Sequence, residues 1–113
     1  MYEHEDIQIT WTGHDGFRIR GTNSQNNQVT VYIDPYQLAS KYQKQNDADV
    51  VLLTHDHFDH LSIDDLKQII NNNTSILSAT ECVEKLAALK VKEIRGIKPG
   101  EKGIIKGLTI EGV

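Results

Sequence analysis

A histidine-rich segment that directly follows a short apolar run constrains this chain more than any other feature. Residues 50–53 read VVLL, and a run this short, apolar and β-branched predicts a buried strand over residues 50–54. The next residues, THDHFDH at 54–60, place three of the five histidines of the chain within six positions. This polar cluster therefore lies at the carboxyl end of a strand, where open α/β sheets place their ligand sites.

The spacing within this cluster predicts a metal site. If the chain stays extended, His55 and His57 project to the same side, because strand side chains alternate. A turn at Phe58 would bring Asp59 and His60 to a second, neighbouring position. Imidazole and carboxylate are typical donors of catalytic zinc, so the two pairs predict two adjacent metal positions. The alternative is a polar loop with solvated histidines, which the H-x-H-x-D-H spacing after a buried strand disfavours.

The motif, THDHFDH, resembles the signature of the metallo-β-lactamase superfamily. Two further segments, ITWTGHDGFRI at residues 9–19 and IDPY at residues 33–36, resemble the branch that contains ascorbate-phosphate lactonase-like hydrolases. The match runs in order over residues 7–113. The resemblance implies an α/β (α+β) fold, the αββα sandwich of that superfamily. This chain would supply its N-terminal half, a mostly antiparallel or mixed sheet with helices on one face.

The resemblance also implies a ligand set. Positions matching His55 and His57 bind the first metal in that family, and positions matching Asp59 and His60 bind the second. The remaining ligands of the family come from the later half of its domain, and this sequence has no histidine after His60. We therefore expect residues 1–113 to form a single, partial domain, truncated before the later ligands.

The activity implied by the resemblance is that of a metal-dependent hydrolase, in which a metal-bound hydroxide cleaves an ester, lactone or phosphate of a small-molecule substrate. The cofactor would be zinc, or alternatively manganese or iron, with up to two ions in a complete site. Asp59 is the expected catalytic residue, since it would orient or deprotonate the nucleophile. The oxygen-reducing di-iron branch is disfavoured, because it carries a glutamate where this chain has His57.

Whether this chain alone is an enzyme is a separate question. Four donors shared between two metals leave two for each, fewer than the three usual for catalytic zinc. Activity would then require completion by the missing half. The alternative is a non-catalytic, truncated piece that binds metal weakly or serves only in assembly.

Two residues outside the motif are candidates for supporting it. Asp34 precedes Pro35, which biases Asp34 toward an extended conformation. A turn-forming aspartate and an aspartate that supports the metal loop fit the sequence equally well, and the family resemblance implies the second role. His14 lies in a turn between Gly13 and Gly16, glycines able to take positive φ. It is either an exposed turn histidine or, as the resembling branch implies, a contact to the substrate or to a metal ligand.

Hydrophobic periodicity predicts the remaining elements. Strands are expected at residues 7–12, 17–20 and 29–33, forming an antiparallel meander. Helices are expected at residues 63–71 and 81–89, the second capped by Thr80, with strands at 75–78 and 91–97 and a closing hairpin over residues 104–110. Residues 36–48 are polar and indicate a surface loop or short helix.

Composition excludes several functional classes. A net charge of −4 does not fit the basic patch that nucleic-acid binding requires, so neither a nucleic-acid partner nor an RNA-processing nuclease is expected. No apolar run reaches about 18 residues, so no membrane span is expected. The first residues lack the pattern of a signal peptide, and Cys82, the only cysteine, cannot form an internal disulfide. The expected location is the cytoplasm.

The strand pattern also predicts association. The three meander strands each place an apolar row on one face, while both expected helices can cover only the other face. An apolar face left in water marks an interface. We therefore expect a homo-oligomer, or pairing with the missing C-terminal half.

Overall fold

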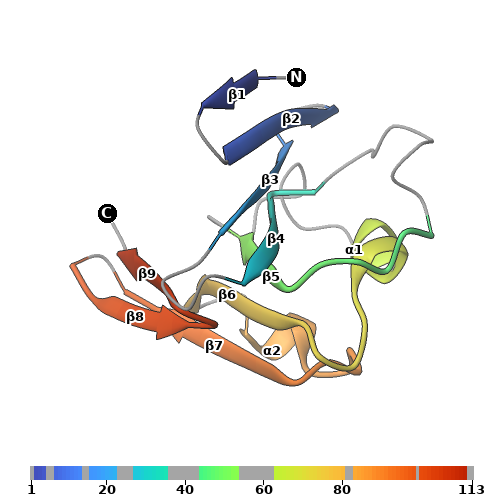
Figure 1. Cartoon of the computed structure of the whole chain (residues 1–113). Helices are drawn as coiled ribbons and strands as arrows, with labels where there is room; N and C mark the ends of the chain where they lie inside the picture. The colour runs from blue at the N-terminus through green and yellow to red at the C-terminus, as the bar shows by residue number, and fades with distance from the viewer. Residues whose placement is uncertain are drawn as a thin grey trace.

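A seven-stranded sheet is the centre of the computed structural model, which describes residues 2–4, 7–13, 16–22, 27–35, 44–53, 63–80, 83–98 and 100–111 (Figure 1). The strands lie in the order β1-β2-β3-β4-β5-β6-β7, and a separate hairpin contains β8 and β9. The bounds are β1 (Tyr2–His4), β2 (Ile7–Gly13), β3 (Gly16–Thr22), β4 (Gln28–Ile33), β5 (Val50–Leu53), α1 (Ile63–Ile69), β6 (Ser75–Ala79), α2 (Val83–Leu86), β7 (Glu93–Ile97), β8 (Lys102–Ile105) and β9 (Leu108–Glu111).

The direction of pairing changes at β4. Strands β1 to β4 pair antiparallel, which confirms the predicted meander, and β4 to β7 pair parallel. Strand β1 was not expected, because three residues near the terminus are too few for periodicity to detect. Since β2 runs in the same direction as β4, the carboxyl ends of β2, β4, β5, β6 and β7 all lie at one edge of the sheet. We call this edge the carboxyl edge.

One face of the sheet is covered by the two helices. Leu66 and Ile69 of α1 and Leu86 of α2 are buried there, and they pack against sheet residues that include Val51 and Ile76. The spacing of Leu66 and Ile69 places both on one side of α1. Burial of each such side chain contributes about 1.5–3 kcal/mol. The prediction that the helices lie on one face is confirmed.

The opposite face is partly covered by the β8–β9 hairpin, which lies across the sheet from α1 in Figure 1. Ile105 is buried against Val31, Val50 and Leu77. The prediction that this whole face is left in water is therefore wrong, because the closing hairpin folds back onto it. Phe17 of β3 remains 41% exposed.

The second helix is shorter than predicted. It ends at Leu86, and the next residues form tighter turns in which Ala87 N donates to Glu84 O (3.3 Å) and Leu89 N donates to Leu86 O (3.0 Å). Such i→i+3 bonds commonly close the end of a helix. Residues 81–82 lie outside the described residues, so the predicted cap at Thr80 stays a prediction.

Candidate functional site

The metal motif begins at the residue after β5. Strand β5 ends at Leu53, which confirms the predicted buried strand to within one residue. The predicted metal ligands His55, His57, Asp59 and His60, including the predicted catalytic Asp59, lie outside the described residues, as does His14. The sheet topology still gives the positions at which these segments are attached. Strand β5 ends and the β2–β3 turn begins at the same carboxyl edge.

Asp34 is the predicted site residue that the structure describes. It follows β4 at the carboxyl edge, is 5% exposed, and donates its backbone N–H to the carbonyl of Leu52 (2.9 Å). Its φ of 46° lies in the left-handed region, so the expected extended conformation is wrong. The bond to the neighbouring strand outweighs the bias from Pro35, and aspartate tolerates this region better than most residues. Such backbone strain clusters at functional sites.

Two residues beside Asp34, Thr12 and Gly16, carry no sequence signal of a functional role. Thr12 is fully buried, and its hydroxyl has no hydrogen-bond partner among the residues that the structure describes. A Cβ built on Gly16 would lie 2.7 Å from Thr12 Oγ1, 2.8 Å from the Asp34 carbonyl oxygen and 3.2 Å from the Ile33 carbonyl oxygen. Gly16 has no positive φ, so close approach rather than turn geometry explains this glycine.

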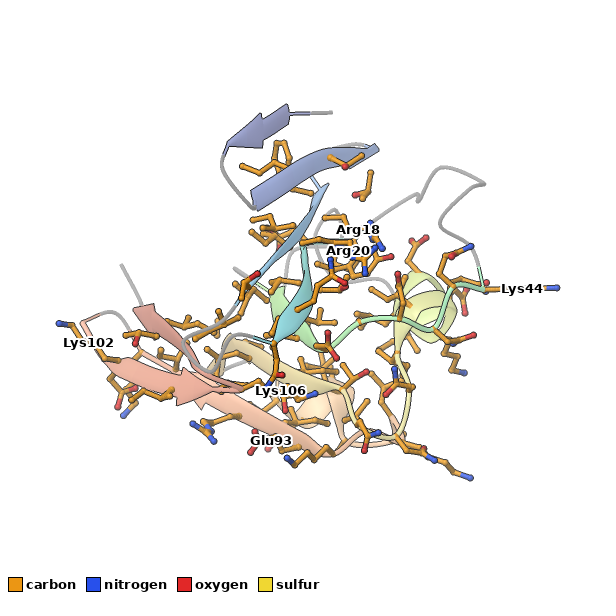
Figure 2. The ribbon with its side chains drawn as sticks, in the orientation of Figure 1. Arg18, Arg20, Lys44, Glu93, Lys102 and Lys106 are labelled. Atoms are coloured by element: carbon orange, nitrogen blue, oxygen red, sulfur yellow. The ribbon has the colours of Figure 1, made fainter. Side chains whose placement is uncertain are left out.

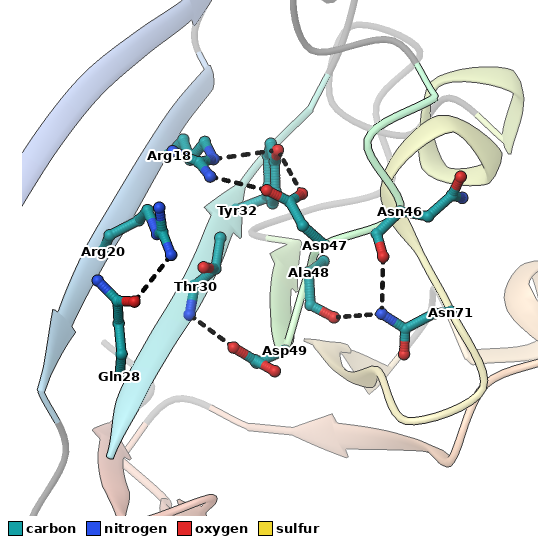
Figure 3. A network of polar contacts seen from close by, with 10 residues as sticks. All are labelled: Arg18, Arg20, Gln28, Thr30, Tyr32, Asn46, Asp47, Ala48, Asp49 and Asn71. Carbon is teal, nitrogen blue, oxygen red and sulfur yellow. Dashed lines mark hydrogen bonds and ion pairs between the residues drawn. The ribbon is translucent and has the colours of Figure 1, made fainter. Parts of the chain in front are cut away.

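A polar network connects β3 and β4 to the segment before β5 (Figure 3). Arg18 donates to the Asp47 carboxylate through Nη2 (2.7 Å) and to the Tyr32 hydroxyl through Nε (3.2 Å). The Tyr32 hydroxyl donates to the second oxygen of Asp47 (2.8 Å). The polar sequence of residues 36–48 predicts only a surface loop or short helix there, and no local signal joins residues 29 positions apart.

Together, burial and hydrogen bonding in this network favour the neutral form of Tyr32 and the charged form of Arg18. Burial raises the pKa of Tyr32 above its ordinary value of 10.0, and the hydrogen bond to Asp47 raises it further. Burial alone would lower the pKa of Arg18, but its hydrogen bond to Asp47 and the neighbouring negative charge give a net increase. Asp47 is therefore fixed between a permanent cation and a neutral hydroxyl donor.

Two segments lead into β5 and β6, and we call them the lead-in segments: residues 44–49 and residues 70–74. Further hydrogen bonds from side chains hold them in place. Thr74 Oγ1 accepts from Asn71 N (2.8 Å) and donates to Ala48 O (2.7 Å). Asn71 Nδ2 donates to Asn46 O (2.9 Å), a contact also drawn in Figure 3. The Asp49 carboxylate accepts from Thr30 N (2.8 Å). These bonds fix where β5 begins.

The hairpin turn is fastened at the same end of the sheet. The ammonium of Lys106 donates to the carbonyls of Asp49 (2.9 Å) and Asn73. In Figure 2, Lys106 lies near Glu93, at the opposite end of the hairpin from Lys102. Burial lowers the pKa of Lys106, and the nearby positive charge of Lys92 adds to this effect. Lys106 and Gly107 both have positive φ, as a two-residue hairpin turn requires.

The described residues alone do not form a metal site. No group of three or more His, Cys, Asp or Glu side chains within them could hold a metal ion. The three imidazoles at positions 55, 57 and 60 and the carboxylate at position 59 form a donor set that suits a divalent transition metal.

Comparisons with known proteins agree on one family. The profile of the β-lactamase superfamily domain matches residues 8–113. A UPF0173 metal-dependent hydrolase from Methanosphaerula palustris is 29% identical over 104 residues, which cover 92% of this chain and 41% of that protein. A UPF0173 metal-dependent hydrolase from Koribacter versatilis is 30% identical over 108 residues, which cover 88% of this chain and 41% of that protein. This chain thus spans about two fifths of the length of these curated relatives.

A solved structure shows the same fold. A protein from Parabacteroides distasonis, described as a metal-dependent hydrolase, matches with a TM-score of 0.58 and 19% identity, over 88% of this chain and 46% of that one. At this identity, the likeness concerns the fold alone. The expected fold class, a mixed sheet of α+β type from the metallo-β-lactamase superfamily, is confirmed.

Proposed function

The chain belongs to the β-lactamase superfamily, and we propose that it is the metal-binding part of a metal-dependent hydrolase. The observation that carries this proposal is the continuity of β5 with the H-x-H-x-D-H motif at the carboxyl edge. Asp34, a buried carboxylate in a strained conformation, lies beside the end of that strand. Its backbone bond to Leu52 ties β4 to β5 immediately before the motif starts.

The residues of the motif have separate roles in this proposal. His55 and His57 hold one cation, while Asp59 and His60 hold a second. Asp59 also orients the attacking water or accepts its proton. A divalent cation bound there, zinc in the first instance, would supply the Lewis acidity that lowers the pKa of a bound water to about 7. Asp34 supports the metal-binding segment, as outer carboxylates do for histidine ligands.

The substrate class in this proposal is a small molecule with an ester, lactone or phosphate bond. The net charge of −4 does not favour a polyanionic nucleic acid. No helix in the described part of the chain is long and apolar enough to span a membrane. Strand β2 ends at Gly13, at the same carboxyl edge, and His14 is the next residue in the sequence, which fits a contact to substrate or to a ligand of the metal.

Zinc titration combined with turnover tests this function. Calorimetry is run on the wild-type chain and on His55→Ala, with His4→Ala as matched control because His4 belongs to β1, outside the motif. We expect weak zinc binding that His55→Ala reduces further and His4→Ala leaves unchanged, since two donors per metal are fewer than the usual three. Zinc-dependent cleavage of a lactone or a phosphodiester would support the hydrolase. Binding that does not depend on His55 would contradict it.

A second candidate function is a non-catalytic metal-binding or assembly piece. The observation that favours it is the coverage of 41% of each curated relative, together with only four donors in the motif. In this case zinc would bind through His55 without turnover of either substrate. Adding a separately produced later segment of a relative would then restore turnover only if the chain is an incomplete enzyme.

The proposal extends to association through the partly covered face of the sheet. Phe17 remains exposed there, and Ile33 and Leu52 are half-buried. We propose that a second copy of the chain, or the later part of a complete domain, covers these residues. Sedimentation at low micromolar concentration should show a dimer that Phe17→Lys disrupts. A cooperatively unfolding wild-type monomer would show that the hairpin already closes the core.

A further inference from the structure

Gly16, Thr12 and Asp34 form a backbone junction at the carboxyl edge for which the metal motif gives no explanation. Gly16 begins β3, Thr12 lies near the end of β2, and Asp34 directly follows β4. The Asp34 carbonyl lies 2.8 Å from the point that a Cβ on Gly16 would occupy, closer than real Cβ contacts allow. The junction therefore accepts no side chain at position 16 unless the backbone of Asp34 moves.

We infer that Gly16 is a positioning residue for the metal-binding segment, because its missing side chain lets the strained Asp34 backbone approach β3 and thereby places the end of β5. The inference rests on the proposed function, since it concerns metal binding by residues 55–60. Gly16 itself lies outside the H-x-H-x-D-H motif.

The connection from Gly16 to the motif passes through adjacent backbone groups. A Cβ on Gly16 would contact the Asp34 carbonyl oxygen. The N–H of the same residue, Asp34, donates to the carbonyl of Leu52 at 2.9 Å. Leu52 lies two residues before Thr54, the first residue of the motif segment. A methyl group at Gly16 must move the Asp34 carbonyl by roughly 0.6 Å to restore an ordinary contact of 3.4 Å. Asp34 cannot absorb this movement freely, because its φ is already in the left-handed region.

The contact with Thr12 is a different case. Thr12 Oγ1 lies 2.7 Å from the same point, but it belongs to a side chain that mutation can shorten. Thr12→Ala removes this contact and leaves the contact with the Asp34 carbonyl. The double variant Thr12→Ala/Gly16→Ala therefore separates simple crowding in the core from displacement of Asp34.

Gly103 offers a matched control for a methyl added to a strand glycine. It lies in β8 of the hairpin, and a Cβ there would lie 3.6 Å from Arg95 Nη1, an ordinary contact. Gly103→Ala adds the same group as Gly16→Ala without moving any backbone. It should leave zinc affinity unchanged.

The test measures zinc affinity by calorimetry and unfolding by urea in parallel for all variants. We expect Gly16→Ala to weaken zinc binding by about tenfold, as changes around metal ligands commonly do. The double variant should remain folded, because it lacks the Thr12 contact, and should bind zinc as weakly as Gly16→Ala. If Gly16→Ala alone unfolds, the double variant gives the answer.

Two results would overturn the inference. The first is a folded Gly16→Ala variant that binds zinc as tightly as the wild type. The second is a double variant that regains wild-type zinc affinity, because this would assign the loss in Gly16→Ala to crowding at Thr12. Failure of the proposed function gives a different result. In that case, zinc binding of the wild-type chain would be absent or unaffected by His55→Ala, whatever happens at Gly16.

Discussion

The two ends of the parallel strands are built on different principles. At the amino ends, side-chain hydrogen bonds from Thr74, Asn71 and Lys106 hold the lead-in segments in place. At the carboxyl edge, the described contacts are close backbone packing at Gly16 and a strained Asp34, next to a buried Thr12 hydroxyl that lacks a described partner. The first end is built for stability, and the second tolerates backbone strain and a buried hydroxyl with no hydrogen-bond partner in the described part of the chain.

This contrast indicates that the fold loses stability at the carboxyl edge, where it keeps the backbone of Asp34 in a strained conformation. Strained backbone and unpaired polar groups persist only where the surrounding structure is firm enough to hold them. The hydrogen-bonded lead-in segments and the helix-covered core supply that firmness. Two fully buried threonines, Thr74 and Thr12, allow the comparison to be tested with the same substitution at each end.

The largest effect is expected at the amino end. Thr74→Val removes both the acceptor for Asn71 N and the donor to Ala48 O, at 2.8 and 2.7 Å. Leaving such buried groups without their partner should lower the free energy of unfolding by about 2 kcal/mol. Urea denaturation measures the loss. A loss no greater than that of an average surface substitution would remove the contrast between the two ends.

A smaller effect with a pH signature is expected at Tyr32. Tyr32→Phe removes the bonds to Asp47 and Arg18 and should cost about 1 kcal/mol at neutral pH. Burial raises the pKa of Tyr32 in the folded state above the ordinary value of 10.0. The folded state therefore retains the proton longer than the unfolded state, so wild-type stability is retained below pH 10 and falls as pH rises further.

The control for this prediction is the pH profile of Tyr32→Phe. Its unfolding free energy should fall less above pH 10 than that of the wild type, because the titrating hydroxyl is gone. Equal slopes for the two proteins would show that the Tyr32 hydroxyl does not differ between the folded and unfolded states.

The smallest effect on stability is expected at the carboxyl edge. Thr12→Val replaces a buried hydroxyl that has no hydrogen-bond partner among the described residues. Removing an unsatisfied polar group should leave stability unchanged or raise it by up to about 1 kcal/mol. A loss similar to that of Thr74→Val, measured by the same urea denaturation, would reveal a bond that the hydroxyl makes in solution.

Alternating apolar residues were sufficient to predict most of the sheet. The strands at 7–12 and 29–33 match β2 and β4 closely, because burial on a pleated sheet imposes a two-residue period, and the continuous apolar run at 50–53 matches β5, which is buried on both faces. The hairpin at the end of the chain was also predicted. Its position on the sheet was not, because Lys106 fixes it through carbonyls 57 and 33 residues away in sequence.

For the candidate site, the sequence alone identifies only the residues that could donate to a metal. The spacing of the motif indicates metal binding, but no local pattern reports that Gly16 meets the Asp34 carbonyl. The conformation of Asp34 was mispredicted for a related reason. The bias from Pro35 is local, whereas the hydrogen bond to Leu52 comes from a strand 18 residues later and overrides it.

The most direct test of the account is the location of the bound metal. Amide resonances of a ¹⁵N-labelled chain are followed during titration with Mn²⁺, which broadens signals from nearby nuclei. We predict broadening of Asp34, Leu52 and Leu53 at the carboxyl edge, with the amides of Thr74 and Lys106 unaffected. Broadening centred on Thr74 and Lys106, or none at the carboxyl edge at saturating metal, would contradict a metal site at the end of β5.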